Sequence, residues 1–258
     1  MQIPDSRRAA SLTLVGAAAG TLLASAVWYL DARRREEKAA RMRREMVQLL
    51  LNALSAGDPA TERHCHRVAD LTDSLAAAFG LKRRDRARLR VAALLHDLGK
   101  IDDQIFDVVH SSHVLSPEER AQVHRHPQES ASILGPLDRA FPGVSTVVKS
   151  HHESWNGDGY PRCLRGDEIP FDARIISVAD VFDALTQPRS YKEPFPVDRA
   201  LAEIRKNAGT RFDPSVVAML DRPEVVRRWR EIARAGRGEE QRARAEDAEK
   251  ESEGQPAR

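Results

Sequence analysis

One segment in the first half of the chain is apolar on nearly every side and then ends in polar residues. It reads "RARLRVAALLHDLGK" from Arg86 to Lys100. A helix that is apolar all round from Val91 to Leu95 must be buried, because no face of it suits water. We therefore expect a buried central helix that closes near Gly99, with other helices packed around it.

Other segments also have helical periodicity. Apolar residues recur at helical intervals in "RVADLTDSLAAAFG" and in "ARIISVADVFDALT", where Asp180 and Asp183 share one face. "SPEERAQVHRHP" begins with a capping arrangement of Ser116 and Glu119, and "FDPSVVAMLD" has a proline in its first turn. Strand candidates are poor, with at most a short hairpin within residues 157–170. The expected fold class is all-α, a helical bundle.

The N-terminal region contains a long stretch without charge. Ala9 to Leu30 is 22 residues, which as a helix spans a hydrocarbon core of about 30 Å. Arginines and lysines are denser after this stretch than before it, so the positive-inside bias places the C-terminal part in the cytoplasm. This predicts a single-pass inner-membrane anchor. A cleaved signal peptide and a twin-arginine export signal in "SRRAASL" are the alternatives.

The remaining regions follow from composition. Gly16 and Gly20 form a GxxxG pattern that favours a homodimer. The predicted organisation is an N-terminal tail at 1–8, the transmembrane anchor at 9–30, a charged stalk helix at 31–54, one domain at 55–232 and a charged, disordered or frayed tail at 233–258.

Charge and cysteine usage exclude several classes of protein. The 41 basic and 39 acidic residues give a net charge of +2, so we expect no DNA or RNA polymer as partner. Cys65 and Cys163 lack CxxC spacing, which argues against a disulfide framework or a thiolate zinc site. This use of cysteine indicates that the protein belongs to a reducing compartment.

Polar residues stand where the helices are otherwise apolar. His96, Asp97 and Asp180 are in such positions, and an ionised carboxylate there costs several kcal/mol unless it is paired or binds a cation. Pairing with Arg67 is the alternative for Asp97, and a backbone hydrogen bond is the alternative for His96. Further histidines lie at expected helix ends or turns near acidic residues: His64, His66, His126, His151 and His152. Imidazoles and carboxylates without thiolates suit iron, manganese, zinc or nickel, so the residues indicate a dinuclear hydrolytic site.

The motifs "HDLGKI", "HHESWNGDGYP" and "VADVFDALT" together resemble the HD-GYP family of HD metal-dependent phosphohydrolases, over about 51–217. The resemblance implies an all-helical HD domain that hydrolyses cyclic di-GMP to pGpG or onward to GMP with two divalent ions. It places one metal histidine at His64 rather than His66 and another at His126 rather than His124. The implied ligand set is His64, His96, Asp97, His126, His151, His152 and Asp180.

The resemblance also implies roles around the metals. Lys100, Tyr160, Asp183, Arg189 and Lys192 fall where family members contact the nucleotide. Asp97 is expected to bridge the ions, and Lys100 to stabilise charge that develops on the phosphate. The turn after the paired histidines is expected to bring Tyr160 to a position where a guanine can stack.

The chain departs from the family pattern at several positions. Cys163 stands where glycine is usual, and "DDQIFDVVHSSHVLS" from Asp102 to Ser116 differs from the usual sequence beside the substrate pocket. Two functions therefore remain open: an active membrane-anchored phosphodiesterase, and a weak or inactive module that binds nucleotide or protein partners in signalling.

Overall fold

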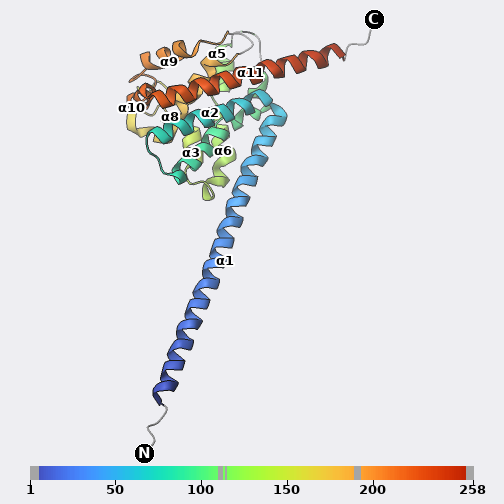
Figure 1. The fold of residues 1–258 in the computed structure, drawn as a ribbon. Coiled ribbons are helices and arrows are strands. Elements are labelled where there is room, and N and C mark those ends of the chain that lie inside the picture. Colours follow the sequence, from blue (N-terminus) through green and yellow to red (C-terminus); the bar gives the residue numbers. More distant parts are fainter. Residues whose placement is uncertain (1–5, 110–112, 114, 189–192, 254–258) are drawn as a thin grey trace, which may run out of the picture. The chain divides into compact units, whose positions relative to one another are not determined.

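The computed structural model describes residues 6–109, 113, 115–188 and 193–253. These residues are helical and contain no β-strand, as the all-α prediction requires (Figure 1). The only pairing of strand type that they show is an isolated bridge between Ala208 and Phe212, so the expected hairpin within 157–170 is absent. The α-helices are α1 (Ser6–Gly57), α2 (Pro59–Ala78), α3 (Arg83–Leu95), α4 (Asp103–Val109), α5 (Pro117–Val123), α6 (His126–Leu134), α7 (Val144–Lys149), α8 (Phe171–Thr186), α9 (Val197–Lys206), α10 (Pro214–Ala218) and α11 (Pro223–Glu253).

The chain divides into two units, residues 1–49 and 50–258. The first unit consists mainly of helix α1. Exposed ion pairs at i,i+4 spacing stabilise this helix, for example Arg33–Glu37 (3.0 Å) and Arg41–Glu45 (2.8 Å).

The predicted membrane anchor is not upheld. Among the residues that the structure describes, no helix is long and apolar enough to cross a bilayer. In α1 the described side chains begin at Ser25, and charged residues follow directly after Leu30. This finding overturns the inner-membrane location, and the GxxxG homodimer stays a prediction.

The second unit is built around α2, α3 and α8. Helix α2 packs against α3, α8 and α11, while α6 packs against α7 and the 3-10 helix η1 (Leu98–Ile101). Ala92 and Leu95 of α3 are buried, which confirms the central helix expected from the sequence. Trp229 of α11 is fully buried, and its indole N–H donates to Ser74 Oγ of α2 at 2.8 Å.

Caps fix where the helices begin. Asp58 accepts hydrogen bonds from the backbone N–H groups of Ala60 and Thr61, both at 3.0 Å, at the start of α2. Ser116 and Glu119 form the reciprocal capping box predicted for α5, with distances of 3.2 and 2.7 Å.

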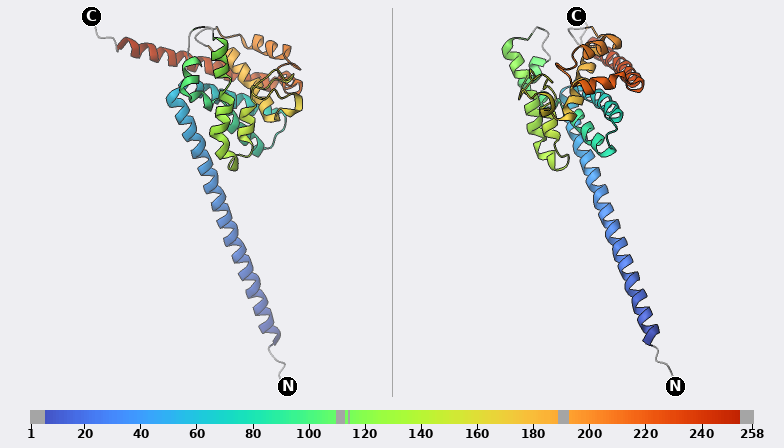
Figure 2. Two further views of the ribbon diagram at one scale, coloured as in Figure 1. Left: turned by 180° about the vertical axis from the view of Figure 1, so that it is seen from behind. Right: turned by 90° about the vertical axis from the view of Figure 1, so that its left-hand side faces the viewer.

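Helix α11 corrects the predicted C-terminal tail. Instead of fraying from Ala233, the chain stays helical to Glu253, and the end of α11 projects away from the rest of this unit (Figure 2). Ala233 and Glu240 are buried, and Glu240 pairs with Arg63 at 2.9 Å and Arg67 at 3.3 Å. The composition of the segment does not reveal this contact, because ion pairs stabilise the contact and the segment has no apolar stripe.

Candidate metal centre

The implied metal ligands lie together although they come from distant parts of the sequence. Three helix ends and two helix interiors supply them: His64 from α2, His96 and Asp97 from the end of α3, His126 from the start of α6, His151 and His152 from just after α7, and Asp180 from α8. The side chains of His96 and His151 are fully buried.

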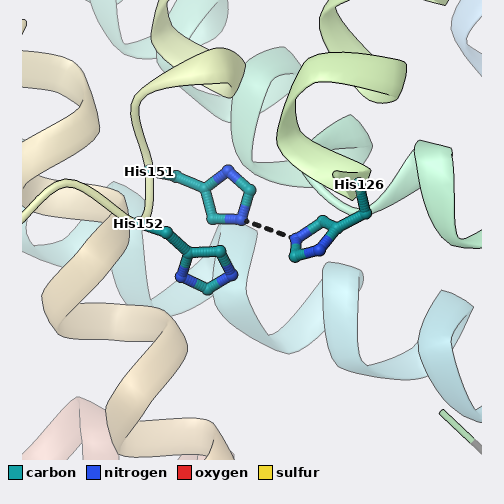
Figure 3. A group of neighbouring side chains, drawn as sticks. All are labelled: His126, His151 and His152. Atoms are coloured by element: carbon teal, nitrogen blue, oxygen red, sulfur yellow. Dashed lines mark hydrogen bonds between the residues drawn. The ribbon is translucent and has the colours of Figure 1, made fainter. Parts of the chain in front are cut away.

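The Asp97 carboxylate lies between two groups of imidazoles. Its Oδ2 is 3.4 Å from Nε2 of His96 and 3.6 Å from Nε2 of His64. Its Oδ1 is 3.2 Å from Nε2 of His126 and 4.0 Å from Nε2 of His151. In each group the potential ligand atoms lie within 4.8 Å of one another: His64, His96 and Asp97 form one, and His126, His151 and His152 the other (Figure 3).

Hydrogen bonds at Nδ1 determine which nitrogen of each ring faces the site. Nδ1 of His96, His126 and His151 lies 2.6–2.7 Å from the carbonyl oxygen of the residue three positions earlier. A carbonyl only accepts, so each Nδ1 carries the proton and each neutral ring presents the bare Nε2 lone pair. Hydrogen bonds from the ring nitrogen that does not face the metal are typical of metal-ligating histidines.

Unpaired buried atoms support a cation at this place. His96 Nε2 and Asp97 Oδ1 are buried without a hydrogen-bond partner, which is costly in a native interior. The Nε2 atoms of His126 and His151 face each other at 3.3 Å, a close approach of two lone pairs when both rings are neutral (Figure 3). Divalent cations bound by these nitrogen and oxygen atoms would satisfy all of them, so the residues present fit the metals that the motifs imply.

The electrostatics favour the protonation states in which His151, His152 and Asp97 can bind a metal ion, namely neutral imidazoles and an ionised carboxylate. Burial lowers the pKa of His151 to about 3, and His96 and His126 add to this effect. Burial likewise holds the pKa of His152 well below its usual value. Burial raises the pKa of the Asp97 carboxyl, but His96 and Lys100 outweigh it and keep that pKa well below the ordinary range.

His96 differs from the other rings. Burial lowers its pKa, but the Asp97 carboxylate outweighs this effect and holds the pKa well above the usual value. The proton that Asp97 stabilises on His96 is the one on Nε2, because Nε2 is the nitrogen that faces Asp97. The same nitrogen would bind a cation. A bound metal ion would therefore replace this proton.

Comparison with known proteins decides the family. The family model described as "HD domain" matches residues 48–216. The chain belongs to the HD domain family. Together with the relatives described next, its "HDLGKI" and "HHESWNGDGYP" motifs place it in the HD-GYP branch.

Relatives of this HD-GYP chain are named as phosphodiesterases. It is 37% identical over 180 residues to 3'3'-cGAMP-specific phosphodiesterase 2 of Vibrio cholerae, which covers 69% of this chain and 34% of that protein. It is 35% identical over 183 residues to the cyclic di-GMP phosphodiesterase response regulator RpfG of Xanthomonas campestris, covering 69% and 47%. The chain thus spans less than half the length of these relatives.

One solved structure supports the fold. The crystal structure of the cyclic GMP-AMP specific phosphodiesterase V-cGAP3 of Vibrio cholerae superposes with a TM-score of 0.52 at 22% identity, covering 70% of this chain and 49% of that one. At this identity the similarity concerns the helical architecture alone.

Two of the residues implied for substrate binding lie beside the metal centre of the HD-GYP domain. Nζ of Lys100 donates to Oδ2 of Asp97 at 2.6 Å. The ring of Tyr160 stacks on His124, with centroids 3.9 Å apart and planes 13° apart, and lies 4.9 Å from the ring of His152. Burial, together with the carboxylates of Asp180 and Asp97, raises the pKa of Tyr160, so its hydroxyl stays protonated.

Asp183 is held by Arg67 and His64. It is 2% exposed, and its carboxylate accepts hydrogen bonds from Nε and Nη2 of Arg67 at 2.8 and 3.0 Å and from Nδ1 of His64 at 2.7 Å. Substrate contact by Asp183 stays a prediction, and in the structure its oxygens contact Arg67 and the candidate ligand His64. Arg189 and Lys192 lie outside the described residues.

The turn after the paired histidines depends on Glu153 and Gly159, for which the sequence patterns predicted no role. Buried Glu153 accepts hydrogen bonds from the backbone N–H groups of Arg162 (2.8 Å) and Leu164 (2.9 Å). A Cβ at Gly159 would lie 2.1 Å from the backbone nitrogen of Ser154, so only glycine fits. Cys163 has a φ of 54°, which explains why glycine is usual there. Glu153 could have been found as the acidic residue that directly follows the paired histidines in the quoted motif.

Proposed function

We propose that this HD-GYP domain is a metal-dependent phosphodiesterase that hydrolyses a cyclic dinucleotide. The observation that carries the proposal is the Asp97 carboxylate, whose two oxygens face two separate groups of imidazoles. A carboxylate in this position suits a bridge between two divalent ions, for which iron or manganese is our first expectation and zinc or nickel the second.

The chemistry divides between the ions and the chain. Divalent ions held by these residues would lower the pKa of a water molecule toward neutrality and stabilise negative charge on phosphoryl oxygens. Lys100 holds a positive charge next to Asp97, where it can donate to a phosphate oxygen as charge develops. Tyr160 offers an aromatic surface beside His152 for a base and a protonated hydroxyl as hydrogen-bond donor.

For the substrate we propose cyclic di-GMP, opened to pGpG or further to GMP. The second candidate is 3'3'-cGAMP, because relatives of comparable identity carry names of both kinds. Both molecules offer two phosphodiesters and at least one guanine, so the same lysine and aromatic surface suit either. Arg189 and Lys192 are proposed as additional phosphate contacts on the strength of the motif resemblance.

Turnover by the purified chain tests the proposal. The full chain is loaded with Mn²⁺ or Fe²⁺ under reducing conditions and incubated separately with cyclic di-GMP and 3'3'-cGAMP, and linear products are separated by chromatography. We expect product from at least one substrate, and none after chelation or in Asp97→Ala. Binding of nucleotide without any product would favour the signalling module instead.

A further inference from the structure

The orientation of His64 depends on a tertiary contact, unlike those of three other histidines of the site. His96, His126 and His151 each bind a carbonyl of their own helical turn through Nδ1. Nδ1 of His64, in contrast, is held by the carboxylate of Asp183 in another helix, α8, at 2.7 Å. The ring of His64 is therefore only as well placed as Asp183.

Asp183 is in turn held by Arg67. The guanidinium donates from Nε and Nη2 to the two oxygens of Asp183, a bidentate pair that fixes the plane of the carboxylate. Arg67 is 7% exposed, and its remaining Nη1 donates to Oε1 of Glu240 at 3.3 Å. Glu240 is also bound by Arg63, through Nε at 3.2 Å and Nη2 at 2.9 Å.

The approach of α11 to this chain of charges is close. A Cβ at Gly236 would lie 2.5 Å from Cδ of Arg67 and 2.9 Å from Oε1 of Gln187. Nε2 of Gln187 donates to the carbonyl of Ala233 at 3.3 Å. Helix α11 thus covers Arg67, and Glu240 contributes a negative charge to this contact.

We propose that Glu240 is a positioning residue of the metal centre, which acts through Arg67 and Asp183 to hold His64 in its ligand orientation. It touches neither metal nor substrate. This makes the C-terminal helix part of the metal site, although α11 lies outside the stretch 48–216 that matches the family model. The proposal rests on the metal centre of the proposed function, so its test measures metal binding without nucleotide.

The experiment compares two glutamates that are neighbours on α11. Glu240 is buried and bound by two arginines, whereas Glu239 is exposed. Glu240→Ala and Glu239→Ala remove the same charge from the same helix. Isothermal titration of the metal-free full chain with Mn²⁺ should show one class of site weakened roughly 3–10-fold in Glu240→Ala, less than the roughly 10–100-fold typical for a residue that contacts a ligand directly, and the wild-type affinity in Glu239→Ala.

A double variant separates positioning from loss of structure. In an Asp183→Asn background the route from Glu240 to His64 is already broken, so adding Glu240→Ala should change Mn²⁺ affinity less than twofold. If Glu240→Ala fails to fold by circular dichroism, Glu240→Gln and Arg63→Gln weaken the same contact more gently and should lower the affinity in the same direction. Wild-type affinity in folded Glu240→Ala, or in both Gln variants where the Ala variant does not fold, overturns the proposal. An equal loss in Glu239→Ala, or a full Glu240 effect in the Asp183→Asn background, does so as well.

Discussion

Oε2 of Glu153 accepts a hydrogen bond of 2.9 Å from the backbone N–H of Leu164, eleven residues further along the chain. Its Oε1 accepts another, of 2.8 Å, from the N–H of Arg162. One carboxylate therefore closes the turn that carries Tyr160, directly after the two adjacent histidines of the metal centre.

Replacement of Glu153 should destabilise the domain. Glu153→Ala leaves two backbone donors without their acceptor, and we expect the free energy of unfolding to fall by about 1–3 kcal/mol. Urea denaturation followed by circular dichroism measures this. Glu168→Ala is the matched control, since that exposed carboxylate accepts from the N–H of Arg165 at 2.9 Å. An equal loss of stability in both variants would mean that the buried Glu153 stabilises the domain no more than an exposed carboxylate does.

Removal of Asp97 should abolish metal binding and activity together. Asp97→Ala takes away oxygens that face both groups of imidazoles, so we expect metal content to fall by at least one ion per chain and turnover by several orders of magnitude. Metal analysis after gel filtration and the product assay check this. Asp221→Ala, which loses only an exposed pair with Arg205, should match the wild type. Full metal content in Asp97→Ala would refute the dinuclear assignment.

Arg189 and Lys192 should affect nucleotide binding without affecting metal. Cations do not ligate cations, whereas a guanidinium or ammonium suits a phosphate. We expect Arg189→Ala and Lys192→Ala to keep their metal content and each to weaken nucleotide binding by roughly 1.5–3 kcal/mol, the value of a charge-assisted hydrogen bond. Calorimetric titration with cyclic di-GMP tests this, with Lys206→Ala on α9 as control. Unchanged affinity in both variants would favour partner binding over catalysis.

The aromatic surface of Tyr160 should matter more than its hydroxyl for base binding. One face of the ring is stacked on His124, so a base must use the other face or displace His124. Tyr160→Phe keeps the ring and should bind nucleotide within a few-fold of wild type, whereas Tyr160→Ala should lose about 1–3 kcal/mol. The reverse order in the same titration would show that the hydroxyl carries the contact.

The sequence predicted the helical fold, and it indicated several candidate ligands for a physical reason. A carboxylate or imidazole inside an apolar helix is costly, so residues such as His96, Asp97 and Asp180 are visible against their surroundings. The capping box of Ser116 and Glu119 is likewise local, since both partners lie within one turn. Features of this kind can be recognised without knowing which segments pack together.

Tertiary partners could not be predicted in the same way. Asp183 shares a helix face with Asp180, but its role depends on Arg67 from α2, which helical spacing within α8 does not reveal. Residues 233–253 lack an apolar stripe, and their helix packs through Gly236 and Glu240, which look unremarkable in a charged segment. The uncharged run from Ala9 to Leu30 led to an anchor that no described helix supports.

The different support of the histidine rings has a consequence for the order in which the site can form. His96, His126 and His151 need only their own helical turn to set Nδ1, so each ring can adopt its final rotamer as soon as that turn exists. His64 waits for α2 and α8 to meet, because Asp183 lies 119 positions away in the chain. Full affinity at the His64 side of the centre therefore appears only after this long-range contact has closed, and delayed metal uptake during refolding would report that step.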